Sequence, residues 1–346
     1  MIEAHFGESP PLSVGVEEEL MILDADTLEP ASAVDVLVSA ADRLDLPGRL
    51  KTEMHASVVE LNTGICANAD EAVAALRELR RAAARIAADN GLAVAAAGAH
   101  PTALLESLPV VQEERYLEMI RSVGRAARRQ GVNGLHVHVG VDSGERCYER
   151  LEAALPWLPV ALALSANSPF MDGVDTGMLS VRAEILGELP RAGAPPALGS
   201  YAGWEGWVER LVALGVIEDY TRIWWDLRPS PRLGTLELRI ADQPTSLERT
   251  ALLVRLLVSI VESGASRAAD PSSRGDYAQN RWAAARHGLD ATLIHPDGDR
   301  TATARELAAE LLGADPPEPE ALRQLEVAAT RGQDAVAADL VARTVA

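Results

Sequence analysis

The sequence predicts an α+β fold in which strands with one polar face alternate irregularly with amphipathic helices. Four segments alternate apolar and polar residues with a period of two, as half-buried strands do. Longer segments between them repeat apolar residues every three or four positions, as helices packed on one side do. The chain has 346 residues, of which 48% are hydrophobic, so one large or two modest domains with a substantial core are expected.

The first predicted strand covers residues 13–23, where apolar and β-branched residues dominate. Alternation places Glu17 and Glu19 on one face and Glu18 on the other, among apolar neighbours. Glu18 is therefore either a functional group or a structural one that is bonded to a backbone amide or an arginine. Glu17 is the stronger functional candidate.

A second strand is expected within residues 53–64, with Glu60 on its polar face. Glu53 and Glu60 are an odd number of residues apart, so in a regular strand they would point to opposite faces. Both can face one site only if a bulge or bend separates them. A helix should follow over residues 68–90, because an asparagine cap with a glutamate three positions later precedes an apolar stripe. Residues 92–97 should form a further strand.

Residues 134–141 show the cleanest alternation in the chain and place His136 and His138 on one side. Two imidazoles at adjacent positions of one face are either satisfied core residues or functional groups, and the pattern favours function. Residues 224–242 predict another strand, in which Glu237 and Arg239 share the face opposite three aliphatic residues. Four strands thus offer glutamate, histidine and arginine to one surface.

The rest of the chain is mainly helical. Patterns bounded by glycine, proline or capping residues cover four further segments, roughly residues 113–130, 146–165, 205–214 and 247–263. After a proline-rich stretch that begins at Pro316, an Ala-, Leu- and Val-rich helical tail is expected to dock on the preceding residues.

Composition excludes several classes of protein. The formal net charge of −19 argues against nucleic-acid binding, which normally needs a basic surface. Cys66 and Cys147 are not spaced as the cysteines of a disulfide framework or a zinc site are. No secretory signal and no apolar run long enough to cross a membrane is visible. A cytoplasmic protein with no membrane partner is therefore expected. The single lysine, Lys51, does not follow a glycine, which excludes a Walker phosphate loop, and no dinucleotide-binding fingerprint follows a strand.

The charges on the shared polar face indicate its chemistry. Clustered carboxylates repel one another, so a buried group either has raised pKa values or binds a cation. Oxygen-rich ligand sets suit Mg²⁺ or Mn²⁺, which commonly bridge carboxylates to nucleotide phosphates. A nearby arginine can stabilise charge on a transferred phosphoryl group. The polar face therefore predicts a nucleotide and metal site.

Eight segments resemble, in this order along the chain, the glutamate-cysteine ligase type 2 branch of the carboxylate-amine ligases. They are residues 15–19, 61–64, 98–101, 114–116, 135–140, 163–170, 175–177 and 225–242. The resemblance implies a glutamine-synthetase-like catalytic fold, with a curved and mainly antiparallel sheet, helices on its convex side, and ATP and cations on its concave face. We expect residues 1–300 to form this catalytic domain and residues 301–346 to form a helical extension docked on it.

Residue by residue, the resemblance assigns roles to the polar face. The implied metal ligands are Glu17, Glu19, Glu53, Glu60, His136 and Glu237. The implied catalytic groups are Glu237, Arg228 and Arg239, with Arg239 on the phosphoryl or acyl-phosphate oxygens. The implied contacts to nucleotide or substrate are Arg228, Arg239, Arg182 and His138, with Arg182 at the substrate carboxylate.

The resemblance also implies a reaction that uses ATP and Mg²⁺ or Mn²⁺. A carboxylate, expected to be the side chain of glutamate, becomes an acyl phosphate, and an amine, expected to be cysteine or another amino compound, then displaces phosphate to give an amide. A homodimer acting on small molecules is implied as well. Thr102 and Ala103 stand where many relatives carry phenylalanine and then tryptophan, so the pocket shape and the amine are left open.

Two alternatives remain open from the sequence. A metal-dependent amide hydrolase could also use His136, His138 and the glutamates. A non-catalytic relative could keep the fold and bind nucleotide, although an intact set of glutamates and arginines favours an enzyme.

Overall fold

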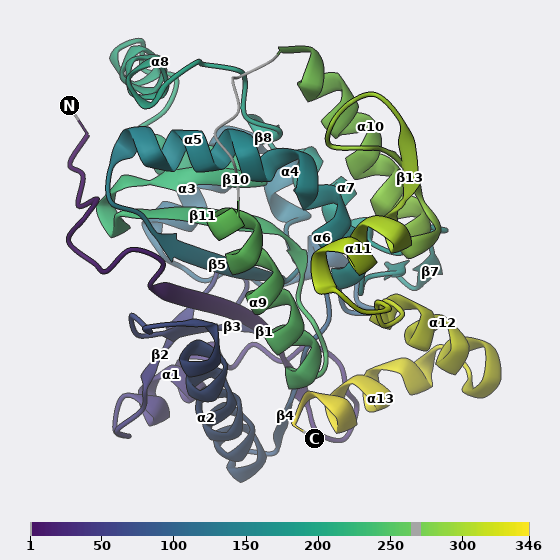
Figure 1. Ribbon diagram of the computed structural model, residues 1–346. Helices are drawn as coiled ribbons and strands as arrows, with labels where there is room; N and C mark the ends of the chain where they lie inside the picture. The colour runs from purple at the N-terminus through teal and green to yellow at the C-terminus, as the bar shows by residue number, and fades with distance from the viewer. Residues whose placement is uncertain (1, 264–270, 346) are drawn as a thin grey trace.

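A computed structural model, which describes residues 2–263 and 271–345, is built around a seven-stranded antiparallel sheet (Figure 1). The strands follow the order β10–β11–β5–β1–β3–β2, and β4 also pairs with β1. Their bounds are β1 (Val14–Asp24), β2 (Gly48–Thr52), β3 (Val58–Thr63), β4 (Leu92–Ala95), β5 (Gly134–Gly140), β10 (Leu227–Ser230) and β11 (Thr235–Asp242). The predicted α+β fold with a mainly antiparallel sheet is confirmed.

One face of the sheet is apolar and covered by helices. Leu20, Leu61, Val137 and Leu236 alternate with polar neighbours along their strands and are fully buried on this face. The covering helices, several of which cross the sheet in Figure 1, are α2 (Ala69–Asp89), α5 (Gly144–Ala154), α6 (Leu158–Ser165) and α9 (Leu247–Ser263). The glutamates and histidines at the intervening positions consequently point to the other face.

The remaining elements surround the sheet. The other helices are α1 (Val34–Ala41), α3 (Glu114–Val123), α4 (Arg125–Arg128), α7 (Val181–Gly187), α8 (Tyr201–Ala213), α10 (Pro271–His287), α11 (Ala304–Leu312), α12 (Glu320–Arg331) and α13 (Asp334–Thr344). Short 3₁₀ turns are η1 (Leu105–Ser107), η2 (Leu155–Trp157), η3 (Tyr220–Arg222), η4 (Pro231–Leu233) and η5 (Gly288–Asp290). Three small pairs complete the strands: β6 (Phe170–Met171) with β7 (Val174–Asp175), β8 (Ala192–Gly193) with β9 (Trp224–Trp225), and β12 (Thr292–Ile294) with β13 (Thr301–Thr303).

The C-terminal helices close one end of the polar face. Val327 of α12 and Leu340 of α13 pack with Met21 and Leu23, which follow Glu19 on the same side of β1. The expected division at residue 300 falls inside the β12–β13 hairpin. The division of the chain into a catalytic domain of residues 1–300 and an extension of residues 301–346 stays a prediction.

Glu18 is a structural residue. It is fully buried on the apolar face, where Arg80 of α2 forms two hydrogen bonds with its carboxylate, at 2.6 and 2.7 Å. Arg80 also donates to the backbone carbonyls of Pro244, Thr245 and Thr344. Of the two roles that the sequence left open for Glu18, the structure shows the ion pair with an arginine.

Three predicted elements differ in detail from the structure. Residues 53–57 form the turn between β2 and β3, and this turn is the bend that Glu53 and Glu60 require. The single strand expected over residues 224–242 is a β10–β11 hairpin, because the turn η4 begins at Pro231, which cannot donate to a strand ladder. The helices expected over 113–130 and 146–165 are each interrupted, at Gly124 and near Pro156.

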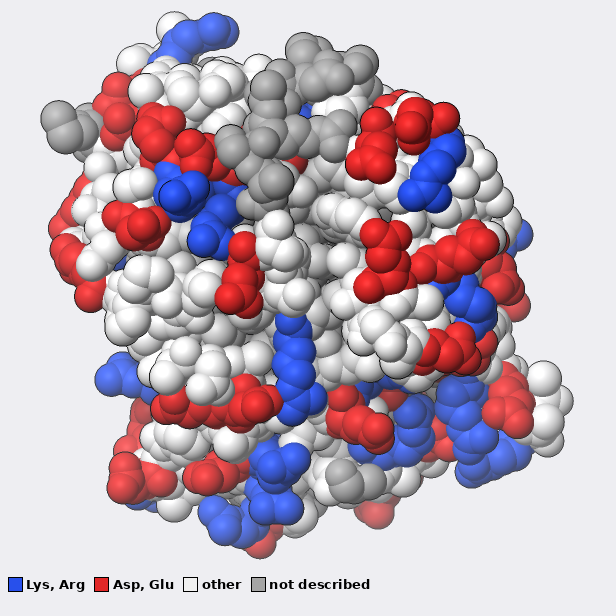
Figure 2. Space-filling model, viewed as in Figure 1, with Lys and Arg blue, Asp and Glu red and all other residues white. Residues whose placement is uncertain are grey.

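No helix within the described ranges combines the length and apolar character that crossing a membrane requires. Acidic and basic side chains are interspersed over the face shown in Figure 2, which has no extended basic surface. Cys66 and Cys147 are both buried and are not joined by a disulfide.

Candidate functional site

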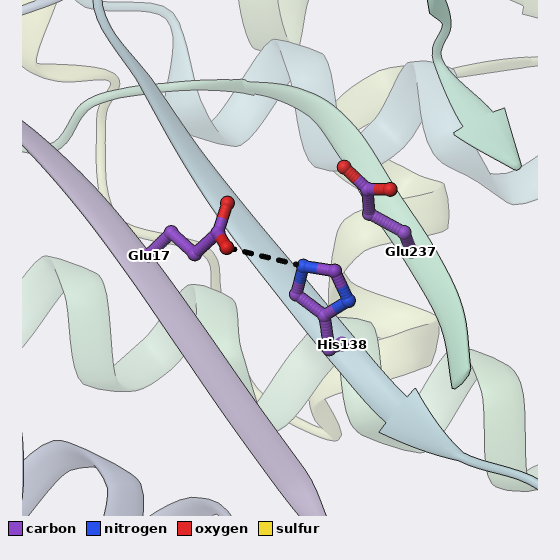
Figure 3. Close-up of side chains that lie close together, drawn as sticks. All are labelled: Glu17, His138 and Glu237. Atoms are coloured by element: carbon purple, nitrogen blue, oxygen red, sulfur yellow. Dashed lines mark ion pairs between the residues drawn. The ribbon is translucent and has the colours of Figure 1, made fainter. Parts of the chain in front are cut away.

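Three central strands bring Glu17, His138 and Glu237 together on the polar face. In Figure 3 these side chains extend from β1, β5 and β11 toward a common point. One ligand atom from each lies within 4.8 Å of the others, and His138 Nε2 is 3.6 Å from Glu17 Oε1. We name these three residues the first acidic group.

The geometry of His138 suits a side chain that binds a cation. Its Nδ1 lies 3.0 Å from the hydroxyl of Thr235, which fixes the ring, whereas the buried Nε2 has no hydrogen-bond partner among the described residues. Burial lowers the pKa of His138, but Glu17 and Glu237 outweigh it and leave the pKa raised. A positive charge is thus favoured where these three side chains meet.

A second acidic group consists of Glu19, Glu53 and Glu60. One carboxylate oxygen from each lies within 4.8 Å of the others. Burial is the main reason that the pKa of Glu19 rises to about 7. Arg182 opposes this rise, and the carboxylate of Glu60 adds to it. Burial and neighbouring carboxylates likewise raise the pKa of Glu53 to about 7 and that of Glu60 to about 8. Three carboxylates this close cannot all ionise near neutral pH without a compensating cation.

Two arginines adjoin the first acidic group. Arg228 Nε donates to Glu237 Oε2 at 2.6 Å, and Arg239 Nη1 donates to Glu237 Oε1 at 2.5 Å. Burial raises the pKa of Glu237, but these two guanidinium groups outweigh it and hold the pKa far below its ordinary value. Glu237 is therefore ionised and links the arginines to the acidic group.

Arg182 enters the site from α7 and lies across β5. A side chain at position 134 would collide with its guanidinium group, so Gly134 is what allows the arginine to lie there. Its Nη1 and Nη2 donate to the carbonyls of Ile240 and Arg239, at a bulge where the β5–β11 register shifts. Burial lowers the pKa of Arg182, and the nearby carboxylates of Asp242 and Glu19 oppose this effect only in part.

The structure places all the predicted site residues on one face and shows which of them lie together. His138, expected at the nucleotide, belongs to the first acidic group. His136, expected as a metal ligand, lies beside that group, with Nδ1 3.3 Å from Glu17 Oε2. Burial and then Arg239 lower the pKa of His136 to about 4, so it is neutral. A role for His136 in metal binding stays a prediction.

Three adjoining pockets follow the polar face. A central pocket of about 370 Å³ contains both acidic groups together with Arg228 and Arg239. A deeper pocket of about 110 Å³ shares Glu19, Glu53, His136 and Arg239 with the central pocket. A third pocket of about 250 Å³ shares Glu17, His138 and Leu233 with the central pocket. A long ligand could therefore reach from one pocket to the next.

The donor sets fit divalent cations that prefer oxygen. Five carboxylates and one imidazole form two neighbouring groups, and oxygen-rich sets of this kind suit Mg²⁺ or Mn²⁺ better than Zn²⁺. With two cations in the groups and two arginines beside them, the face could bind a polyphosphate and stabilise a transferred phosphoryl group.

Periodicity did not identify several residues of the deep pocket. Asn133 lies in the irregular segment before β5, and Gln130, the last residue of the helical pattern expected over residues 113–130, also lies outside a helix in the structure. Thr235 supports His138, but a threonine at a strand start is too common to stand out. Trp224 lines the pocket whereas Trp225 is buried against Trp207, as expected when only one of two adjacent residues can face a ligand.

Comparison with known proteins gives consistent matches. Residues 13–336 match the family described as glutamate-cysteine ligase family 2 (GCS2). A Rubrobacter xylanophilus protein provisionally named glutamate-cysteine ligase 2-3 is 41% identical over 313 residues, which cover 90% of this chain and 85% of the relative. A Solibacter usitatus protein provisionally named glutamate-cysteine ligase 2 is 36% identical over 309 residues, which cover 88% of this chain and 80% of the relative.

The fold has a counterpart among solved structures. The crystal structure of glutamate-cysteine ligase from Francisella tularensis in complex with AMP matches with a TM-score of 0.66 and 16% identity, covering 97% of this chain and 89% of that one. At this level of identity the likeness supports a shared fold.

Proposed function

Because this chain belongs to glutamate-cysteine ligase family 2, and is therefore a carboxylate-amine ligase, we propose that it uses Mg-ATP to join the side-chain carboxylate of glutamate to an amine. The amine is cysteine or another small amino compound. The chain thus acts on small molecules, and the amide it forms is accompanied by ADP and phosphate.

One observation carries this proposal: both acidic groups, Arg228 and Arg239 line the central pocket, and this pocket shares residues with the two others. In the proposed complex, the triphosphate of ATP lies in the central pocket and the nucleoside lies toward the 250 Å³ pocket. The acid substrate lies in the 110 Å³ pocket, where Glu19 and Glu53 form the shared wall. The AMP bound to the Francisella ligase supports a nucleotide in this fold, and the placement here rests on the pockets of this chain.

In the first step, a carboxylate oxygen of the acid attacks the γ-phosphorus of ATP. The bond between the γ-phosphorus and the β–γ bridging oxygen breaks, so ADP leaves and an acyl phosphate forms. Bound Mg²⁺ would neutralise phosphate charge at the two acidic groups. In this proposal Arg239 stabilises the phosphoryl oxygens, and Arg228 holds Glu237, and with it Arg239, in position through the bonds that both arginines donate to this glutamate.

In the second step, the nitrogen of the amine attacks the acyl carbon, and phosphate leaves with the electrons of the carbon–oxygen bond. The nitrogen must lose a proton, and phosphate or a nearby carboxylate can accept it. The protein contributes positioning and exclusion of water, with no covalent intermediate on a side chain.

The two alternatives left by the sequence are less well supported. A hydrolase would not need two arginines bound to a central glutamate, and the family is a ligase family. A non-catalytic relative would not need to keep both acidic groups intact.

The test is ADP release by the purified full-length protein from Mg-ATP, with glutamate and a panel of amines that includes cysteine. We expect amine-dependent ADP and a product whose mass equals acid plus amine minus water. Glu237→Gln should abolish turnover in a folded protein, whereas the exposed Glu310→Gln should not change it. Absence of nucleotide turnover with every acid and amine would overturn the proposal.

A homodimer and a cytoplasmic location are part of the proposal. The buried, unpaired cysteines are consistent with a reducing compartment. Light scattering of the purified protein and fractionation of the cells that produce it test the two statements.

A further inference from the structure

A fourth pocket, of about 460 Å³, opens beside the catalytic face. It is larger than each of the three pockets along the polar face, and Tyr220 and Arg232 line both it and the central pocket. Its other walls come from helix α8, from the residues just before η3 and from the N-terminal segment. A molecule in this pocket could therefore extend past Tyr220 toward the two acidic groups.

The turn η3 forms the wall between the fourth pocket and the central pocket. Asp219, which lines the fourth pocket, caps this turn by accepting from the amide and the hydroxyl of Thr221, at 2.8 and 2.5 Å. Arg228, whose Nε donates to Glu237, also donates to the carbonyls of Thr221 and Ile223, at 3.3 and 2.6 Å. The wall of the fourth pocket is thus bonded directly to an arginine of the catalytic face.

One part of the lining is apolar. It consists of Ile2, Val212, Ala213 and the ring of Tyr220, and Val212 is 40% exposed. An apolar side chain that is exposed in a hollow contributes free energy of binding when an apolar group covers it. This part of the pocket therefore favours a ligand with an apolar body.

The other part of the lining is mainly acidic. It consists of Glu3, Glu209, Glu218 and Asp219, together with one basic residue, Arg232. Arg232 is itself engaged by the wall, because its Nη2 lies 3.5 Å from Asp219 Oδ2 and its guanidinium carbon lies 5.7 Å from the centre of the Tyr220 ring.

Neighbouring cations outside the lining compensate only part of the negative charge. Arg222 pairs with Glu218 at 2.6 Å, and His5 is shared between Glu3 and Glu8. Four carboxylates of the lining thus face two guanidinium groups and one shared imidazole. The pocket consequently favours a cationic ligand and disfavours one that carries a carboxylate.

The amine is the substrate whose properties fit this pocket. In the proposed complex, ATP and the acid occupy the three pockets of the polar face, and an amine is a cation in neutral solution until it loses a proton. A cavity of about 150 Å³ holds a benzene molecule, so a pocket of about 460 Å³ can hold an aromatic or branched aliphatic body.

We propose that the fourth pocket binds the apolar body of the amine substrate, whose nitrogen reaches the acyl carbon past Tyr220. The substrate is then a primary amine with an apolar body and no carboxylate, rather than an amino acid such as cysteine. This proposal rests on the proposed ligase function and narrows its second substrate.

The first test is ADP release by the full-length protein from Mg-ATP and glutamate, with two pairs of amines that differ only in a carboxylate. The pairs are phenethylamine with L-phenylalanine and cysteamine with L-cysteine. In each pair, kcat/KM should be at least about tenfold higher for the amine without the carboxylate, because one like-charge contact near a protein surface has an effect of this order.

A second test fills the pocket by Ala213→Trp. Ala213 is exposed in the last turn of α8, so the added ring occupies the pocket without entering the core. Hydroxylamine, which has no apolar body and reacts directly with acyl phosphates, is the reference amine. The ratio of kcat/KM for phenethylamine to that for hydroxylamine should fall about tenfold in Ala213→Trp. Leu214→Trp, at the next position and outside the lining, is the matched control and should keep the wild-type ratio.

Three results would overturn the inference: equal use or no use of both members of either pair, a preference for the amino acid, or an unchanged ratio in Ala213→Trp. Any of these together with ADP release that depends on hydroxylamine or cysteine would leave the ligase proposal standing. No ADP release with any amine, hydroxylamine included, would overturn both proposals.

Discussion

Glu18 and Glu19 are neighbours in sequence, yet the structure predicts opposite consequences when each is replaced by glutamine. Glu18→Gln keeps the shape of the side chain but removes the charge that faces Arg80 in the core. The buried guanidinium group would then have no carboxylate partner. Breaking a buried ion pair in this way costs about 3–5 kcal/mol. The three backbone carbonyls that also accept from Arg80 hold the loss near the lower end.

A loss of about 3 kcal/mol is a large part of the 5–15 kcal/mol that typically stabilises a folded domain. Urea unfolding followed by circular dichroism should therefore show a clear drop in stability for Glu18→Gln, with ADP release per folded molecule unchanged. Glu19→Gln should show the reverse, with little change in stability and loss of ADP release. The exposed Glu78→Gln on α2 is the control and should stay within about 0.5 kcal/mol of wild type. A loss below about 1 kcal/mol for Glu18→Gln would refute the structural role assigned to its carboxylate.

Three further outcomes concern the acidic groups. The affinity for Mg²⁺ should rise between pH 6 and pH 8, because Glu19 and Glu53, with pKa values of about 7, and Glu60, with a pKa of about 8, must lose protons to bind it. The same raised pKa values make the stability of the metal-free protein depend on pH. Their contribution is complete below pH 4.5, the pKa of these carboxyl groups in the unfolded chain, and is lost as the pH rises through 7 to 8. Bound Mg²⁺ should remove this loss of stability. Calorimetric titration and urea unfolding at several pH values check both statements, and a pH-independent affinity would contradict them. Thr235→Val removes the hydroxyl that orients His138 and should weaken cation binding about 10- to 100-fold without unfolding the protein, whereas an unchanged affinity would show that His138 is not a ligand.

Period-two alternation was sufficient to predict which side chains share a face. Glu17, His136 and Glu237 were expected to face one surface, and the antiparallel pairing of β1, β5 and β11 places them there. Glu18 was expected among apolar residues for the same reason. These predictions needed only the geometry of a strand, which the sequence shows directly.

The contacts within that face depend on register, which alternation does not determine. Glu17 lies opposite His136 in the β1–β5 pairing, whereas Glu237 lies opposite His138 in the β5–β11 pairing. The first acidic group therefore combines Glu17 with the histidine diagonal to it. A one-residue shift in either pairing would have changed the group, and only the folded structure specifies the register.

The deep pocket could not be predicted from local patterns. Gln130 and Asn133 come from an irregular segment, Arg182 from the short helix α7, and Glu53 from a turn. Residues brought together from such distant segments show no common spacing. Glu53 and Arg182 were expected at the site only because of the family resemblance, whereas Gln130 and Asn133 were found only in the folded structure.

Transfer of ¹⁸O from the acid to phosphate tests the central claim most directly. The acid that supports ADP release would be labelled with ¹⁸O in its reacting carboxylate, and the phosphate formed with the amide would be analysed by mass spectrometry. The proposed acyl phosphate predicts one ¹⁸O atom in phosphate for each amide formed, because the oxygen that attacks the γ-phosphorus leaves with it. Phosphate without the label, or label that appears in AMP instead, would contradict activation of the acid by phosphoryl transfer.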